Sequence, residues 1–223
     1  METRRLGTTD TEVTVLGYGA GPLGNLYRAV SDEDAASTVA AAYDAGIRYF
    51  DTAPFYGLGR SERRIGNALR ARDDIVLSTK VGRLLRADEG LSGSEERYGF
   101  VDPLPFAVVY DYTYDGILRS VEDSYLRLGR ARIDIALVHD IGAVTHGADD
   151  GRYFAQLTTG GGYRALEELR AAGTVSTIGL GVNEAAICER CMDIGQWDAF
   201  MLAGRNTLLE QECLTGLMAR CVK

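Results

Sequence analysis

The stretch Ile47-Arg48-Tyr49-Phe50-Asp51-Thr52-Ala53-Pro54-Phe55-Tyr56-Gly57 decides how the rest of the chain is interpreted. Its apolar beginning predicts a short strand, which ends at Asp51 and is followed by a turn that carries Tyr56. A buried strand has no structural need for a carboxylate at its carboxyl end. In a barrel of parallel strands, reactive side chains gather at that end, so Asp51 and Tyr56 are the first candidate site residues.

Three more predicted strands end at a polar side chain. Two apolar segments end at Lys80 and at His139, and a third ends immediately before Asn183. Neighbouring parallel strands present their carboxyl ends at one edge of a sheet. The sequence therefore predicts one constellation, made of Asp51, Tyr56, Lys80 and His139.

Helix-forming segments alternate with these strands along the chain. Ser31 can cap the first helix, and Gly129 can end a long amphipathic helix over residues 116–128. The predicted strands are nearly continuous apolar runs, as in a parallel sheet that is covered on both faces. They span residues 13–16, 47–50, 75–80, 133–139, 175–182 and 200–203.

This pattern predicts an α/β fold, a (β/α)8 TIM barrel rather than a doubly wound sheet. A β-hairpin over residues 3–12 is predicted before the first strand. About six of the eight strand-helix units fall within residues 1–223, which we interpret as one barrel domain. We therefore expect strands 7 and 8 to be missing from this chain. A barrel needs all eight strands to close, so the barrel would be incomplete.

Three connections between these elements have no regular pattern. The Gly-rich segment 17–24 follows the first predicted strand, which indicates close approach of the backbone to a ligand. Residues 82–115 have few helix signals and form either a lid or binding loop or a tolerated surface insertion. Residues 141–162 are predicted as a second irregular loop.

The composition argues against several classes of function. A net charge of −8 disfavours nucleic-acid and membrane-surface partners, because both need a basic face. No apolar run is long enough to span a membrane and no secretory signal is visible, so we expect a cytoplasmic protein. The chain has only two histidines, and we therefore expect no metal site.

All four cysteines lie in the last quarter of the chain, which favours a reducing compartment over a disulfide scaffold. Cys188 and Cys191 match the pattern C-x-x-C on a predicted amphipathic helix. No second pair of ligands follows, so we interpret this pair as structural rather than as a redox or metal site.

The predicted constellation has complementary chemistry. The Lys80 ammonium would stabilise the deprotonated phenol of Tyr56, and Asp51 would keep Lys80 charged. His139 would position a substrate oxygen. Tyr56 could then donate a proton to an alkoxide or remove one from an alcohol, which suits hydride transfer at a carbonyl carbon. The alternative is an aldolase-type lyase with a Schiff base on Lys80, which the neighbouring carboxylate disfavours.

The sequence contexts of these residues resemble those of the aldo-keto reductases. The resemblance is carried by FDTAPFYG at 50–57, LSTKVG at 77–82, DIALVHD at 134–140, GLGVNE at 179–184 and LLEQ at 208–211. These motifs are similar to the branch that contains D-threo-aldose 1-dehydrogenase (L-fucose dehydrogenase) and pyridoxal dehydrogenase. The resemblance implies a catalytic tetrad of Asp51, Tyr56, Lys80 and His139, with Tyr56 as the general acid/base.

The same resemblance implies an NAD(P) cofactor, with Asn183 at the nicotinamide carboxamide. The implied cofactor-binding residues are Gly19, Ala20, Gly21, Asp51 and Asn183. The implied activity is hydride transfer between NAD(P) and the anomeric carbon of an aldose, which gives a lactone, or a related aldehyde or alcohol. The implied partner is thus a small sugar or aldehyde.

Family members are longer than this chain and place the loop for the cofactor phosphates after strands 7 and 8. An inactive truncated fragment or a non-catalytic relative is therefore the alternative prediction. An incomplete barrel also exposes sheet edges that favour association, so a homo-oligomer is a further expectation.

Overall fold

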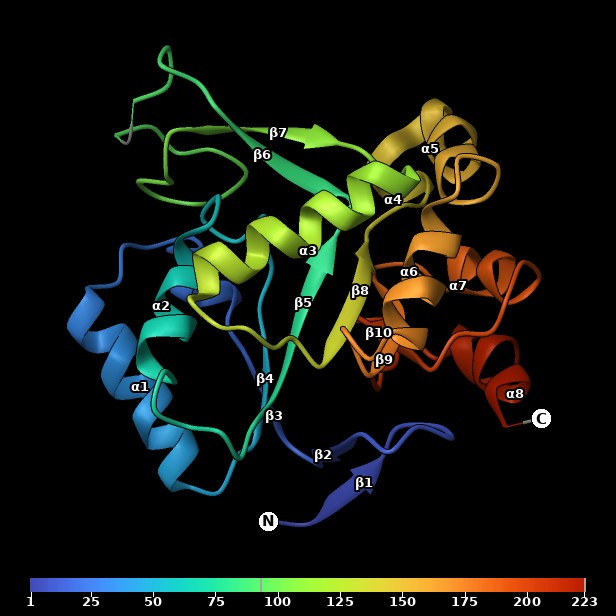
Figure 1. The fold of residues 1–223 in the computed structure, drawn as a ribbon, viewed down its shortest axis with the longest axis horizontal. Coiled ribbons are helices and arrows are strands. Elements are labelled where there is room, and N and C mark those ends of the chain that lie inside the picture. Colours follow the sequence, from blue (N-terminus) through green and yellow to red (C-terminus); the bar gives the residue numbers. More distant parts are fainter. Residues whose placement is uncertain (93, 223) are drawn as a thin grey trace.

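The computed structural model describes residues 1–92 and 94–222, and its central element is a curled parallel sheet. The strand order is β10-β9-β8-β5-β4-β3, and each neighbouring pair is parallel. These strands are β3 (Gly17–Gly19), β4 (Tyr49–Asp51), β5 (Val76–Val81), β8 (Ile135–His139), β9 (Thr177–Val182) and β10 (Ala199–Leu202). The predicted fold is confirmed as a partial (β/α)8 barrel with six strands (Figure 1).

Both faces of the central strands are buried. In β8, Ala136 and Val138 belong to the main core beneath the helices. Ile135 and Leu137 lie on the opposite face, where they form a second cluster with Val13. Successive side chains of a strand point to opposite faces, so a strand that is buried on both sides needs an unbroken apolar run.

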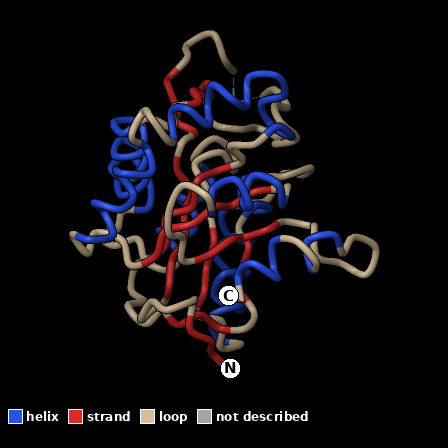
Figure 2. Tube along the Cα trace, turned by 90° about the vertical axis from the view of Figure 1, so that its right-hand side faces the viewer, coloured by secondary structure: helices blue, strands red, loops and turns tan. Residues whose placement is uncertain are grey.

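Helices cover the outer face of the sheet, and Figure 2 shows most strands near the centre of the view, with helices on several sides of them. Ser31 caps the first helix by accepting a hydrogen bond from the Asp34 amide at 3.0 Å, as predicted. Gly129 ends the third helix with φ of 60°, also as predicted. The covering helices are α1 (Asp32–Asp44), α2 (Arg60–Ala68), α3 (Tyr114–Leu128), α6 (Gly162–Ala171) and α7 (Ala185–Met192).

The N-terminal hairpin closes the bottom of the barrel. Its strands β1 (Thr3–Arg5) and β2 (Glu12–Thr14) are antiparallel and lie below the parallel sheet in Figure 1. Val13 packs against the inward side chains of β8, and the hydroxyl oxygens of Thr11 and Thr177 are 2.8 Å apart. The catalytic candidates therefore lie at the opposite, open end.

The predicted first barrel strand at residues 13–16 is wrong. Val13 belongs to the hairpin, whereas Val15 and Leu16 are 46% and 61% exposed. The first strand of the sheet is β3, within the Gly-rich segment, followed by η1 (Gly21–Gly24). Gly17 is needed there because a Cβ would lie 2.7 Å from the Tyr49 ring. A three-residue edge strand with glycine at both ends has no apolar pattern by which it could be predicted.

Two segments that were predicted as irregular contain regular structure. Residues 82–115 hold an antiparallel pair, β6 (Arg83–Ala87) and β7 (Phe106–Tyr110). Residues 141–162 hold α4 (Ala143–His146), η2 (Gly147–Asp149) and α5 (Asp150–Leu157). None of these three helical segments has a side-chain cap at its N-terminus, so the usual sequence signal is absent.

After β10 the chain continues through η3 (Glu212–Leu214) and α8 (Leu217–Cys221). β3 and β10 form the two edges of the sheet, with one paired neighbour each within the described residues. In residues 1–92 and 94–222, we find no helix with the length and apolar character that a membrane crossing requires.

The contact between α2 and α3 generates a prediction about stability. At Gly66 an added Cβ would lie 1.9 Å from the Leu128 carbonyl oxygen, which is backbone and cannot turn away. We expect Gly66→Ala to lower the free energy of unfolding by about 2–3 kcal/mol, measured by urea denaturation.

Gly151→Ala is the matched control, because Gly151 is also helical but an added Cβ would meet nothing within 4 Å. Alanine has the higher helix propensity, so this change should leave stability unchanged or raise it by up to about 1 kcal/mol. Equal stability of the two variants would show that α2 and α3 do not pack as closely as described.

Candidate active site

Strand alternation places three predicted residues on the inner face of the barrel. Asp51, Lys80 and His139 lie at or near the carboxyl ends of β4, β5 and β8, which are adjacent in the sheet. In the register of the sheet, Asp51 is opposite Ser78 and His139 is opposite Gly181. The parallel arrangement therefore brings these side chains together although they are far apart in the sequence.

Lys80 and Asp51 form a buried ion pair. Lys80 Nζ donates to Asp51 Oδ2 at 2.7 Å and to the Thr52 carbonyl oxygen at 3.0 Å. The Ser78 hydroxyl donates to the other carboxylate oxygen at 2.6 Å. Burial alone would lower the pKa of Lys80, but the Asp51 carboxylate and Tyr56 together outweigh burial and raise it. Lys80 is therefore a fixed ammonium.

Room for the Lys80 side chain comes from a glycine on β9. A Cβ at position 181 would lie 2.9 Å from Lys80 Cε. Gly181 faces the barrel interior, opposite His139 in the register. The glycine therefore permits the extended lysine to reach Asp51 across the inside of the barrel.

Tyr56 lies above this ion pair, in the turn after β4. Backbone hydrogen bonds hold the turn, from the Tyr56 amide to the Ala53 oxygen and from the Ser61 amide to the Tyr56 oxygen, each 3.2 Å. The Tyr56 ring centroid is 4.7 Å from Lys80 Nζ and 5.9 Å from the His139 ring. The structure therefore brings all four predicted catalytic residues together.

His139 is buried and neutral. Its Nδ1 atom has no hydrogen-bond partner among the described residues. Burial is the main cause that holds the pKa of His139 well below its usual value, and the nearby Arg83 and Lys80 charges act in the same direction. The Tyr112 hydroxyl donates to the His139 carbonyl oxygen at 2.8 Å, which fixes the end of β8. A neutral imidazole suits the positioning of a substrate oxygen.

Tyr56, Lys80 and His139 line a cavity of about 260 Å³. Tyr98 and Phe100, from the connection between β6 and β7, form part of its wall and lie 5.2 and 5.6 Å from the Phe55 ring, centroid to centroid. The cavity is thus aromatic on one side and polar on the other. Its lining residues are Leu26, Phe55, Tyr56, Lys80, Tyr98, Phe100, His139, Asp140, Gly181, Val182, Asn183, Met201 and Ala203.

Asn183 follows β9 and borders two hollows. It lines the cavity beside Tyr56 and also a groove of about 570 Å³ that runs along η3. Its Nδ2 atom donates to Asp140 Oδ1 at 2.9 Å, and no other hydrogen bond of its carboxamide occurs in the described part of the chain. The Asn183 side chain thus keeps its oxygen as a free acceptor and one N–H as a free donor. A carboxamide on a ligand can pair with both of these groups. The residues present therefore fit the nicotinamide end of a dinucleotide.

The other predicted cofactor residues lie apart from this cavity. Gly19, Ala20 and Gly21 are at the end of β3 and do not line it. The Ala20 amide donates to the Asp51 carbonyl oxygen at 2.8 Å, and the Ala20 oxygen accepts from Ser61 at 2.7 Å. An added Cβ at Gly19 or Gly21 would meet nothing within 4 Å, so the space beside this backbone is open.

Sequence reasoning missed three residues of the site. Ser78 completes the shell around Asp51, and its two-residue spacing from Lys80 was the available signal. Asp140 was given no role beyond its place at the end of the motif over residues 134–140. Arg83 is only 4% exposed and forms an ion pair of 2.7 Å with Asp140. Nothing local marks this arginine, because its partner is 57 residues away.

The C-x-x-C pair and the second histidine of the chain take structural positions. Cys188 and Cys191 are buried, and burial raises the pKa of each thiol to about 12, in line with a structural role. His146 stacks on the Tyr153 ring at 4.0 Å between centroids. Residues 1–92 and 94–222 contain no group of three His, Cys, Asp or Glu side chains that could hold a metal ion.

Comparison with known proteins gives consistent matches. Residues 15–221 match the sequence model of the Aldo/keto reductase family. Pyridoxal 4-dehydrogenase of Microbacterium luteolum is 47% identical over 218 residues, which cover 94% of this chain and 64% of that protein. D-threo-aldose 1-dehydrogenase of a Pseudomonas species is 41% identical over 215 residues, 95% of this chain and 63% of that protein. This chain thus spans less than two thirds of either relative.

A solved structure supports the same match. The holo form of aldo-keto reductase AKR11C1 from Bacillus halodurans superposes with a TM-score of 0.66 and 27% identity. The superposition covers 90% of this chain and 56% of that one.

The burial of His139 predicts how stability depends on pH. Its folded-state pKa is lowered, so below about pH 6.5 the unfolded chain binds a proton that the folded chain does not. The free energy of unfolding should therefore fall as the pH is lowered from 7.5 to 5.5, by at most about 1.4 kcal/mol per pH unit for one histidine.

His146 has a pKa shifted in the same direction, chiefly by burial, so the measurement is made in His146→Gln. NMR of the single remaining imidazole should show no titration across this range. An imidazole of His139 that titrates with a midpoint near about 6.5 would contradict the assignment of a neutral ring.

Proposed function

Because the chain belongs to the aldo/keto reductase family, we propose that it is an NAD(P)-dependent oxidoreductase with Tyr56 as its general acid/base. Its substrate is an aldose that reacts at the anomeric carbon, or a related aldehyde or alcohol. The observation that carries this proposal is the Lys80–Asp51 ion pair at 2.7 Å, which lies beneath the Tyr56 ring and beside His139.

The bound cofactor would accept a hydride from the substrate carbon, or supply one to it. Asn183 is the residue that would hold its carboxamide. In the oxidative direction Tyr56 removes the hydroxyl proton of the substrate, and the Lys80 ammonium stabilises the negative charge that forms on the phenol oxygen. The neutral His139 hydrogen-bonds to the substrate oxygen and orients it. Oxidation at an anomeric carbon then gives a lactone.

The shape and lining of the cavity support a small ring substrate. The cavity is small, about 260 Å³, and Phe55, Tyr98 and Phe100 line it with aromatic rings against which a ring substrate can pack. The two relatives are named for a pyridoxal and an aldose, and both names denote small molecules with one ring or ring-forming chain. Tyr56 and His139 supply polar groups for the substrate oxygen on the other side.

The Schiff-base alternative has less support. A lysine must be neutral to attack a carbonyl carbon, and the Asp51 carboxylate keeps Lys80 protonated. Lys80 Nζ donates hydrogen bonds to Asp51 and to the Thr52 carbonyl oxygen, as a protonated amine does. Lys80 is thus an electrostatic partner of Tyr56 and not a nucleophile.

The role of Tyr56 is tested by removing one oxygen atom. Tyr56→Phe should lower the turnover of L-fucose or pyridoxal roughly 10²- to 10⁴-fold, because the hydroxyl is needed only when the proton moves. Cofactor affinity, measured by titration of nicotinamide fluorescence, should stay nearly unchanged.

Tyr27→Phe is the control, since Tyr27 is 81% exposed and lies outside the cavity. It should keep full turnover. A loss of cofactor affinity in Tyr56→Phe as large as the loss of rate would refute a specific role in proton transfer.

A further inference from the structure

Asp140 connects three parts of the site that sequence reasoning treated separately. Its Oδ2 atom lies 2.7 Å from Arg83 Nη2 and 3.6 Å from His139 Nε2. Its Oδ1 atom accepts the Asn183 Nδ2 hydrogen bond at 2.9 Å. The carboxylate thus joins the start of β6, the end of β8 and the residue after β9.

Arg83 anchors the Asp140 carboxylate through a buried ion pair. Its guanidinium is buried, with its carbon atom 4.4 Å from the centroid of the Phe55 ring. Its Nε atom has no hydrogen-bond partner among the described residues, so Asp140 is the one carboxylate that balances this buried charge. An unpaired buried guanidinium would be costly, and Arg83 therefore fixes Asp140 in place.

The chemistry of a carboxylate decides the orientation of Asn183. An ionised aspartate only accepts hydrogen bonds, so it must face the NH2 group of a carboxamide and never its oxygen. Asn183 Oδ1 is then turned away from Asp140 and left as an acceptor. Without a charged partner, the two ends of the Asn183 side chain would exchange freely.

We propose that Asp140, anchored by Arg83, is a positioning residue that presents Asn183 Oδ1 to the nicotinamide carboxamide. This inference rests on the proposed function, because it assumes that Asn183 meets the cofactor. It also gives a role to Arg83, the first residue of β6, a strand that pairs only with β7 outside the barrel sheet.

The backbone at Asp140 makes a clean substitution available. Asp140 has φ of 42°, in the left-handed region that asparagine also tolerates. Asp140→Asn therefore keeps size and conformation while it removes the charge that selects one end of Asn183. Asp102→Asn is the matched control, because Asp102 is exposed, has φ of 46° and does not line the cavity.

The experiment is an NMR titration of the ¹⁵N-labelled chain with nicotinamide mononucleotide. The Asn183 side-chain amide signals are assigned by their loss in Asn183→Asp. In the parent chain these signals should shift on titration. Asp140→Asn should weaken the apparent affinity about tenfold, the scale of one net hydrogen bond, with Asp102→Asn within about twofold of the parent.

Arg83→Lys is the second variant, which leaves Asp140 charged but without its forked partner. It should weaken the affinity in the same direction by a smaller factor, and its thermal unfolding midpoint reports whether the fold is intact. The proposal is overturned if the parent signals of Asn183 do not move, if Asp140→Asn binds like the parent, or if Asp102→Asn loses as much.

The two proposals fail in different ways. Asn183 signals that respond to the mononucleotide, together with weaker binding in Asp140→Asn, in a chain that oxidises neither L-fucose nor pyridoxal would support the positioning role and remove the proposed function. Normal turnover with parent-like affinity in Asp140→Asn would retain the proposed function and remove the positioning role.

Discussion

The buried ion pair between Lys80 and Asp51 is the constraint on which the rest of the site depends. Taking both charges out of water is costly, and their attraction compensates only when the remaining hydrogen-bonding positions are also filled. Ser78 and the Thr52 oxygen fill them, and Gly181 leaves the space that the lysine chain crosses. The pair in turn places an ammonium 4.7 Å from the Tyr56 ring centroid. A tyrosine becomes an acid/base candidate through this neighbour.

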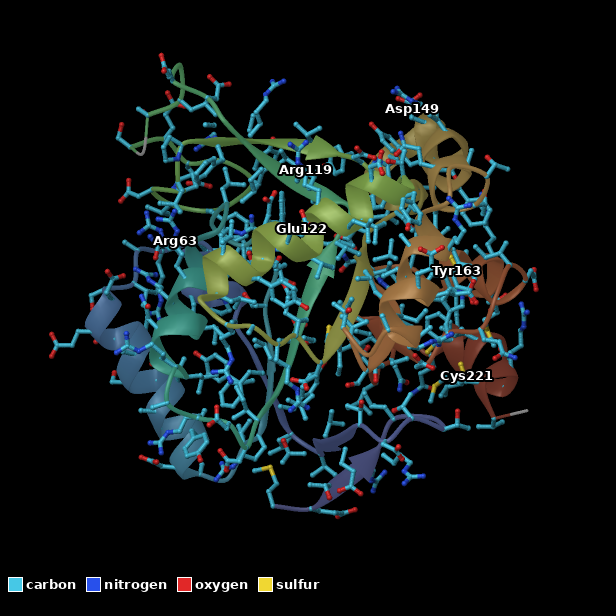
Figure 3. The ribbon with its side chains drawn as sticks, in the orientation of Figure 1. Arg63, Arg119, Glu122, Asp149, Tyr163 and Cys221 are labelled. Atoms are coloured by element: carbon cyan, nitrogen blue, oxygen red, sulfur yellow. The ribbon has the colours of Figure 1, made fainter. Side chains whose placement is uncertain are left out.

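Parallel pairing converts this local constraint into an active-site geometry. β4, β5, β8 and β9 are consecutive in the sheet, so their carboxyl ends form one continuous rim. The hairpin β1–β2 closes the other end with Val13, which leaves the rim as the open side. Figure 3 shows Glu122 and Arg119 on the outward side of α3, among the side chains that cover the barrel from outside. On this side, the parallel sheet and α3 both lie between the rim and these solvent-facing charges.

Much of this arrangement could be predicted from the sequence. Largely apolar runs revealed β5, β8 and β9, because strands buried on both faces need them. The polar residues that ended those runs, Lys80 and His139, identified the rim. Edge strand β3 could not be predicted, since glycines leave no apolar signal. The β6–β7 pair and the Arg83–Asp140 contact depend on partners that are distant in the sequence, and no local pattern encodes them.

The central claim is that this rim moves a hydride while Lys80 stays charged and unreacted. The most direct measurement uses L-fucose and pyridoxal, each deuterated at the carbon that is oxidised, with mass spectrometry of the recovered cofactor. We expect the reduced nicotinamide to gain one deuterium and Lys80 to remain unmodified after borohydride treatment. Deuterium released to water, together with a borohydride-trapped substrate adduct on Lys80, would contradict it.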